Sequence, residues 1–156
     1  MRHLDLGEME TRLGPADVTY PLTDALGATD VAVNYYELDP GESFAYGYHA
    51  HAEQEEVFYV QSGTVTFRTA DGDREVGAGE LVRFAPGEYQ RGVNEGEERV
   101  VALAIGAPQE AGETDIRRHC EECGTDTTQE LELVGDREAV VVRCGECGTE
   151  TDRYGR

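Results

Sequence analysis

The chain has 156 residues, enough for one ordinary domain and a small appendage. Hydrophobic residues make up 38% of it, and 19 Gly, 5 Pro and no Trp favour a turn-rich β protein over a helical bundle. The net charge of −20 comes from 33 acidic residues against 13 basic ones, so no basic patch exists to neutralise phosphates and nucleic acid is a poor partner.

The basic residues are all Arg, and the chain contains no Lys. Like charges oppose compaction at ordinary ionic strength, whereas at ~1 M salt the Debye length falls to about 3 Å and screens them. The composition therefore resembles that of halophilic archaeal proteins more than that of a merely acidic mesophilic protein. The N-terminus has no apolar signal segment, and no stretch approaches ~18 consecutive apolar residues, so we expect a cytoplasmic protein without a membrane partner.

Residues 1–30 predict an arm with one short strand. Beyond the arm, runs of β-branched and aromatic residues end at turn signals. These runs predict strands at residues 31–38, 44–51, 57–61, 64–69, 74–76, 80–84, 89–93 and 99–105. Ser62-Gly63 predicts a tight hairpin, and residues 70–73 predict a second turn. Short strands at intervals of roughly 8–12 residues indicate an all-β sandwich or closed barrel.

The character of the chain changes at Gly106. Residues 107–113 are polar and contain Gly and Pro, which is typical of a linker. We therefore expect a barrel domain with its N-terminal arm at residues 1–108, a linker at 109–116 and a second domain at 117–156. In the second domain, two strand-like runs at 129–134 and 139–143 flank a turn at 135–136.

His49 and His51 share one face of a predicted strand, because alternate residues of a strand point the same way. Glu56 opens the next strand after a short polar turn, so its carboxylate can close on the same point. Two imidazoles and one carboxylate hold divalent iron, manganese, nickel or zinc. The alternatives are a polar, solvated loop, or a barrel without metal whose histidines are satisfied by hydrogen bonds.

Residues 30–106 resemble the cupin family, which has two sequence motifs. The first motif is matched here, in order, by Pro40-Gly41, His49, His51, Glu56 and Gly63. The stretch from Gly41 to His49 is two residues longer than the usual pattern. The second motif is matched from Gly79 to Asn94, with Pro86 shifted by one position and Gln90 where the family has a histidine.

This resemblance implies a cupin β-barrel, a double-stranded β-helix or jelly roll, with one ligand-sized cavity. It implies a divalent metal held by His49, His51, Glu56 and Gln90. Such a set of two nitrogens and two oxygens leans towards Mn²⁺ or Fe²⁺, and Zn²⁺ or Ni²⁺ also fit. Alternatively, Gln90 hydrogen-bonds a metal-bound water instead of binding the metal.

Three further residues are candidates for binding a small-molecule ligand or substrate in that cavity. Phe58 and Val60 are two and four residues after Glu56, so they lie on the same face of the strand and are expected to line the cavity. Arg83, on a strand near the second motif, could anchor an anionic substrate through a bidentate contact, although such an Arg is more often a solvated surface residue.

The C-terminal segment carries two Cys-x-x-Cys pairs, each followed by Gly and separated by residues 124–143. Four thiolates at this spacing match a tetrahedral Zn²⁺ site, and the segment resembles a zinc ribbon. The predicted ligands are Cys120, Cys123, Cys144 and Cys147. Rubredoxin-type iron and two disulfides are the alternatives, the latter disfavoured in a reducing cytoplasm. His119 is expected to be a neighbour and not a ligand, because four Cys complete the shell.

The cupin resemblance implies one of two functions, since this fold hosts many chemistries. The first is a metal-dependent enzyme acting on a small organic molecule, of oxygenase, isomerase or hydrolase type. The second is a non-catalytic small-molecule-binding or sensing protein, whose ribbon docks a protein partner. No general acid or base stands out beyond the metal ligands, so no catalytic residue is assigned. A homodimer is compatible with either function.

Overall fold

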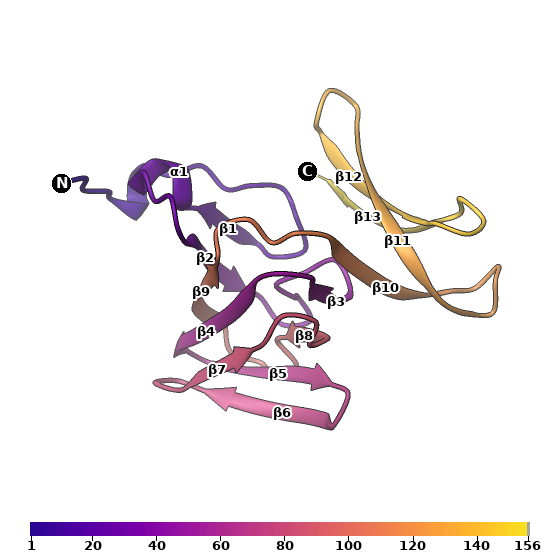
Figure 1. Cartoon of the computed structure of the whole chain (residues 1–156), viewed down its shortest axis with the longest axis horizontal. Coiled ribbons are helices and arrows are strands. Elements are labelled where there is room, and N and C mark those ends of the chain that lie inside the picture. The colour runs from indigo at the N-terminus through magenta and orange to yellow at the C-terminus, as the bar shows by residue number, and fades with distance from the viewer. Residues whose placement is uncertain (156) are drawn as a thin grey trace.

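Two antiparallel β-sheets make up the fold, and the computed structural model describes residues 1–155 (Figure 1). The first sheet has five strands, in the order β1 (Val18–Pro21), β2 (Ala32–Leu38), β9 (Val100–Ala107), β4 (Glu55–Ser62) and β7 (Leu81–Phe84). The second sheet has eight, in the order β13 (Glu150–Gly155), β12 (Ala139–Cys144), β11 (Thr125–Val134), β10 (Thr114–Cys120), β3 (Tyr48–His51), β8 (Gln90–Val93), β5 (Thr64–Thr69) and β6 (Gly72–Gly77). This is the predicted all-β architecture of a cupin barrel followed by a small cysteine-bearing ribbon.

In the described part of the chain, helical structure is confined to two short pieces of the N-terminal arm, η1 (Leu6–Glu8) and α1 (Thr23–Leu26). The arm's predicted short strand is β1, which pairs with β2 and so extends the first sheet. Within residues 1–155, no helix has the length and apolar character needed to cross a membrane.

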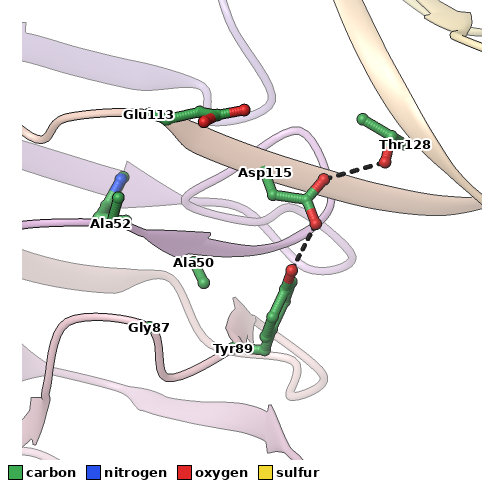
Figure 2. Close-up of a pocket in the computed structure, with 8 residues that line it drawn as sticks. Ala50, Ala52, Gly87, Tyr89, Glu113, Asp115 and Thr128 are labelled. Carbon is green, nitrogen blue, oxygen red and sulfur yellow. Dashed lines mark hydrogen bonds between the residues drawn. The ribbon is translucent and has the colours of Figure 1, made fainter.

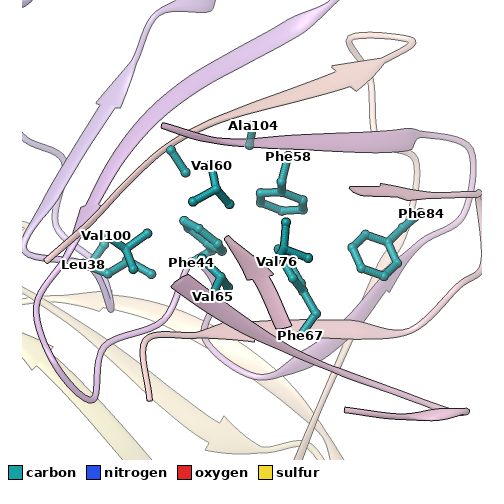
Figure 3. Close-up of a cluster of buried hydrophobic side chains, with 12 residues drawn as sticks. Leu38, Phe44, Phe58, Val60, Val65, Phe67, Val76, Phe84, Val100 and Ala104 are labelled. Atoms are coloured by element: carbon teal, nitrogen blue, oxygen red, sulfur yellow. The ribbon is translucent and has the colours of Figure 1, made fainter. Parts of the chain in front are cut away.

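The hydrophobic core lies between the two sheets of the barrel (Figure 3). Alternate residues of β4 and β9 point into it, which is why Phe58 is 2% exposed and Val60 and Val100 are fully buried. From the opposite sheet, Phe67 places its ring centroid 5.0 Å from that of Phe58. Removing a ring from such a site costs about 3–5 kcal/mol of stability, so this aromatic cluster is a principal stabilising element of the barrel.

The tight turn at Ser62-Gly63 connects the two sheets, and the prediction of a hairpin there is wrong. β4 pairs with β7 and β9, whereas β5 pairs with β6 and β8. Gly63 has φ 74°, and a Cβ on it would lie 2.8 Å from the carbonyl oxygen of Arg99. A glycine is therefore required where the chain turns this corner. The second predicted turn does form a hairpin, joining β5 to β6.

The strand that carries the histidine pair is shorter than predicted, because β3 spans only Tyr48–His51. The preceding residues instead approach β8, where the N–H of Phe44 donates to the carbonyl oxygen of Gly92 at 3.2 Å. At Gly47 a Cβ would lie 2.8 Å from the carbonyl oxygen of Arg117. This glycine lets β10 pass close to the start of β3.

β10 belongs to both the barrel and the ribbon. Its first half pairs with β3, from Thr114 opposite His51 to Arg117 opposite Tyr48. From Arg117 to Cys120 it pairs with β11. Figure 1 shows the orange and yellow strands β11, β12 and β13 standing beside the barrel, joined to it through β10. The strand begins inside the segment 109–116 that the composition indicated as a linker, so the last residues of that segment are part of a sheet.

Candidate metal centres

Three side chains from β3 and β4 converge at one wall of the barrel. His49, His51 and Glu56 each offer a ligand atom, and these atoms all lie within 4.8 Å of one another. The Nε2 of His51 is 3.6 Å from the Oε2 of Glu56. Around an octahedral ion with bonds of about 2.1 Å, adjacent ligand atoms lie about 3.0 Å apart and opposite ones about 4.2 Å. The separations are therefore those of a set that needs only small movements to enclose a divalent ion.

The second nitrogen of each imidazole has an oxygen neighbour. The Nδ1 of His49 lies 3.2 Å from the carbonyl oxygen of Gly47, and the Nδ1 of His51 lies 2.9 Å from the Oγ1 of Thr114. Donation from Nδ1–H to these oxygens leaves the Nε2 lone pairs free to bind a metal and fixes the ring orientations. Thr114 was not predicted, because no motif links it to His51, which is 63 residues away in the chain.

Gln90 completes the cluster from β8, opposite His49 in the pairing of β3 with β8. Its side chain is 2% exposed, and its Nε2 lies 3.0 Å from Glu56 Oε2 and 3.3 Å from His49 Nε2. Its Oε1 is buried with no hydrogen-bond partner. Turning the amide by 180° would place this oxygen beside Glu56 and His49, where a cation would satisfy it. The donor set therefore fits a divalent metal.

Burial lowers the pKa of His49, and the nearby Glu56 charge opposes that effect. The imidazole is thus kept neutral, which is the form that binds a metal. Burial also raises the pKa of Tyr36, and the Glu56 charge raises it further. Tyr36 is therefore a protonated phenol at neutral pH, able to donate a hydrogen bond.

The metal-ligand cluster opens into a cavity of about 410 Å³. Its lining combines the ligands with aromatic and polar residues of the barrel and the arm, and with one residue of the ribbon. The lining residues are Arg12, Asn34, Tyr36, Phe44, Ala45, Tyr46, His49, His51, Gln54, Glu56, Phe58, Thr114, Ile116 and Leu131. Leu131 lies on β11, so the ribbon contributes to the wall of the barrel cavity.

Of the predicted cavity residues, Phe58 lines the cavity, whereas Val60 is fully buried in the core. Arg83 lies on β7 with its Nε 2.5 Å from the Oε2 of Glu55, and both side chains are largely exposed. This ion pair already engages the guanidinium, and Arg83 is not among the described residues that line the cavity.

A second hollow, of about 450 Å³, lies on the outer side of β3 and β10 (Figure 2). Here Asp115 accepts hydrogen bonds from the hydroxyl of Tyr89 and, at 3.1 Å, from that of Thr128. Because these polar groups satisfy one another, this hollow offers less to a ligand than the cavity with the metal-ligand cluster does.

The four cysteines of the ribbon form a second cluster. Cys120 is the last residue of β10 and Cys144 the last of β12, and Cys123 and Cys147 lie in the turns that follow these strands. The Sγ atoms of Cys120 and Cys147 are 3.6 Å apart, and those of Cys123 and Cys144 are 3.8 Å apart. A tetrahedral ion with Zn–S bonds of 2.3 Å would place its sulfurs about 3.8 Å apart. The thiols are unpaired, and the geometry fits a metal and not two disulfides.

Backbone turns hold each cysteine pair in place. The N–H of Gly124 donates to the carbonyl oxygen of Cys120, and that of Gly148 to the carbonyl oxygen of Cys144, both at 2.8 Å. The hydroxyl of Thr127, 3.1 Å from the Sγ of Cys144, lowers the pKa of that thiol to about 6. A thiolate is thus favoured at one corner of the cluster before any metal binds.

His119 is not part of the cysteine cluster. Its Nδ1 lies 3.3 Å from the Oδ1 of Asp126, and its side chain is largely exposed. The metal-ligand group found here among the described residues consists of the four cysteines alone.

Comparison with known families matches residues 34–106 to the model of the cupin domain. No curated protein matches the chain. A sugar phosphate isomerase of the cupin superfamily from Silicibacter pomeroyi is similar over 96% of this chain and 91% of its own, with a TM-score of 0.61 and 22% identity. A predicted oxalate decarboxylase from Thermotoga maritima is similar over 68% of this chain and 98% of its own, with a TM-score of 0.59 and 20% identity.

A putative sugar phosphate isomerase from Acidithiobacillus ferrooxidans is also similar, with a TM-score of 0.54 and 23% identity. That similarity covers 86% of this chain and 75% of the other. At such identities the likeness concerns the fold, and it agrees with the barrel described above.

Proposed function

We propose, from the premise that residues 34–106 form a cupin domain, that this protein is a metal-dependent enzyme acting on a small organic molecule. The observation that carries the proposal is the convergence of His49, His51, Glu56 and Gln90 on one point of a 410 Å³ cavity. Three of these residues offer ligand types that suit Mn²⁺ or Fe²⁺, and the buried, unpartnered Oε1 of Gln90 would offer a fourth once the amide is turned towards the ion.

A divalent ion held there would supply a Lewis acid and an open position for a substrate oxygen. The protein's own residues would orient the substrate and limit water. Phe44 and Phe58 give the cavity an apolar side, while the protonated hydroxyl of Tyr36 can donate a hydrogen bond to a substrate oxygen. The cavity volume of about 410 Å³ lies in the range of pockets that bind small organic molecules.

The named structural neighbours act, by their names, on sugar phosphates or oxalate, which are small and acidic. Isomerisation of a sugar-like molecule and chemistry on a small carboxylic acid are therefore the reaction types to test first. A non-catalytic binding or sensing protein is the second candidate. The observation that favours it is the pair Leu131 and Leu133, 44% and 60% exposed on β11 of the ribbon, which offers an apolar surface to a protein partner.

For the ribbon we propose a structural Zn²⁺ on Cys120, Cys123, Cys144 and Cys147. The separations of the sulfur atoms support this choice of metal. Four protein ligands close the coordination shell, so the role of this ion would be to stabilise the ribbon and not to take part in catalysis.

The proposal is tested by elemental analysis of the full chain purified in molar KCl, with mass spectrometry of any small molecule that co-purifies. We expect wild type to carry zinc and a second metal, His49→Ala to carry zinc alone, and the control His3→Ala, an exposed position, to match wild type. Turnover of the co-purified molecule by the metal-loaded protein would separate an enzyme from a sensor. Retention of both metals by His49→Ala would contradict the proposal.

A further inference from the structure

Arg12, Tyr46 and Leu131 form the mouth of the barrel cavity. All three line the cavity that holds the metal ligands and also an adjoining hollow of about 450 Å³. They come from three parts of the chain: the N-terminal arm, the segment before β3, and β11 of the ribbon. A ligand entering from the adjoining hollow therefore passes these three side chains.

The backbone of the arm is fixed at this point. The N–H of Arg12 donates to the carbonyl oxygen of Thr19 at 2.7 Å, and the hydroxyl of Tyr46 donates to the carbonyl oxygen of Leu13 at 3.2 Å. The ring of Tyr46 packs edge-to-face on Tyr154, with centroids 5.4 Å apart. The guanidinium of Arg12 is thus presented at the mouth by a segment of the arm that is hydrogen-bonded to Tyr46, a residue that itself packs on the ribbon.

Arg12 keeps its charge available in a chain of net charge −20. Within residues 1–155, seven arginines form ion pairs with carboxylates: Arg68, Arg83, Arg99, Arg117, Arg118, Arg143 and Arg153. Arg12 is not one of them, although carboxylates are plentiful. It is also the arginine that lines the cavity with the metal ligands, within the described part of the chain.

The charge of Arg12 acts on the interior of the cavity. Burial raises the pKa of Tyr36, Glu56 raises it further, and Arg12 opposes both. Burial likewise raises the pKa of Tyr46 and Arg12 opposes it. Arg12, Tyr36 and the candidate ligand Glu56 line the same cavity, so the guanidinium and the ligand cluster share one small space.

We propose that the cavity binds a small organic anion, whose acidic group pairs with Arg12 while its other end reaches the metal ligands. The inference deepens the proposed function and rests on it. A guanidinium offers a planar fork of donors that matches a carboxylate or a phosphate, and an arginine without a carboxylate partner has no competing ion pair to break. The acidic surface would repel anions generally, so Arg12 provides a local site for one anionic group.

The test is calorimetric titration of the full chain with two probes, oxalate and inorganic phosphate, at one fixed salt concentration, with and without Mn²⁺. We expect Arg12→Gln to weaken binding of the preferred probe about tenfold, the scale of a lost charge-assisted hydrogen bond, and Arg12→Lys to weaken it less. Arg74→Gln removes the same charge from an exposed position on β6, and is expected to bind as wild type does. The probe that binds more tightly assigns the anionic group to a carboxylate or to a phosphate.

Three results would overturn the inference: neither probe binding wild type, Arg12→Gln binding as wild type does, or Arg74→Gln losing as much affinity as Arg12→Gln. A separate Mn²⁺ titration of wild type distinguishes this failure from failure of the proposed function. If Mn²⁺ binds but the anion does not depend on Arg12, the inference fails and the metal site stands. If Mn²⁺ does not bind but the metal-free protein still binds the probe through Arg12, the metal site fails and the anion site stands.

Discussion

Replacing Thr114 by Val would remove the hydroxyl beside the Nδ1 of His51 while keeping a β-branched side chain on strand β10. The imidazole would lose the oxygen 2.9 Å away that fixes its orientation and its tautomer. Its Nε2 would then spend less time directed at the metal position. We therefore expect the barrel metal to bind more weakly, with the ribbon metal unaffected.

Loss of a partner that orients a metal-bound histidine typically costs 10–100-fold in affinity, or about 1.4–2.7 kcal/mol. Thr114 is exposed, so water can partly replace its hydroxyl, which puts the expected loss at about tenfold. The assay is titration with Mn²⁺ of protein loaded with one equivalent of Zn²⁺ per chain, followed by the electron paramagnetic resonance signal of the free ion. Zinc on the cysteines keeps the ribbon site out of the titration, because thiolates prefer it to Mn²⁺.

Two variants make this result interpretable. Thr114→Ser keeps the hydroxyl and is expected to restore most of the affinity, whereas Thr128→Val removes a hydroxyl that bonds Asp115 and is expected to leave Mn²⁺ binding unchanged. Unchanged affinity in Thr114→Val would refute the orienting role. Equal weakening in Thr114→Val and Thr114→Ser would show that the side-chain packing of β10, and not the hydroxyl, was responsible.

Three further predictions concern the two metal sites and the surface charge. Gln90→His should raise the affinity of the barrel site for its metal and shift the selectivity of the site towards Zn²⁺ or Ni²⁺, as measured by competition titration. An affinity no higher than that of wild type would count against direct coordination by Gln90. Cys123→Ser should unfold the ribbon while the barrel stays folded, because the buried core cluster lies entirely within residues 16–104; loss of all β-sheet circular dichroism would contradict this. The thermal midpoint should rise from low to molar KCl as 33 carboxylates are screened, and a flat or falling midpoint would refute adaptation to high salt.

The sequence predicted which side chains of the barrel come together. His49 and His51 share a face through the two-residue period of a strand and Glu56 opens the next strand, whereas Gln90 was expected only from the resemblance to the cupin family. The same rules located the four cysteines, which cluster as predicted. Side-chain groupings that depend on local sequence patterns can therefore be predicted from the sequence.

The remaining site residues depend on contacts between distant segments. Thr114 reaches His51 only because β10 pairs with β3, and Arg12 and Leu131 reach the mouth only through the placement of the arm and the ribbon. The hairpin prediction at Ser62-Gly63 was wrong for the same reason: the turn residues specify a reversal of the chain, but not which sheet the next strand joins. Pairing partners are set by the packing of the whole barrel.

The sharing of β10 has a consequence for any shortened form of the protein. A chain ending before Thr114 would leave β3 without a neighbour on one side, and the backbone N–H and C=O groups of Tyr48–His51 that β10 now engages would face solvent. An uncovered strand edge is a template for pairing with another chain. The isolated barrel would therefore be prone to self-association along the strand that carries His49 and His51. Strand β10, which leads into the ribbon, also covers this edge of the barrel.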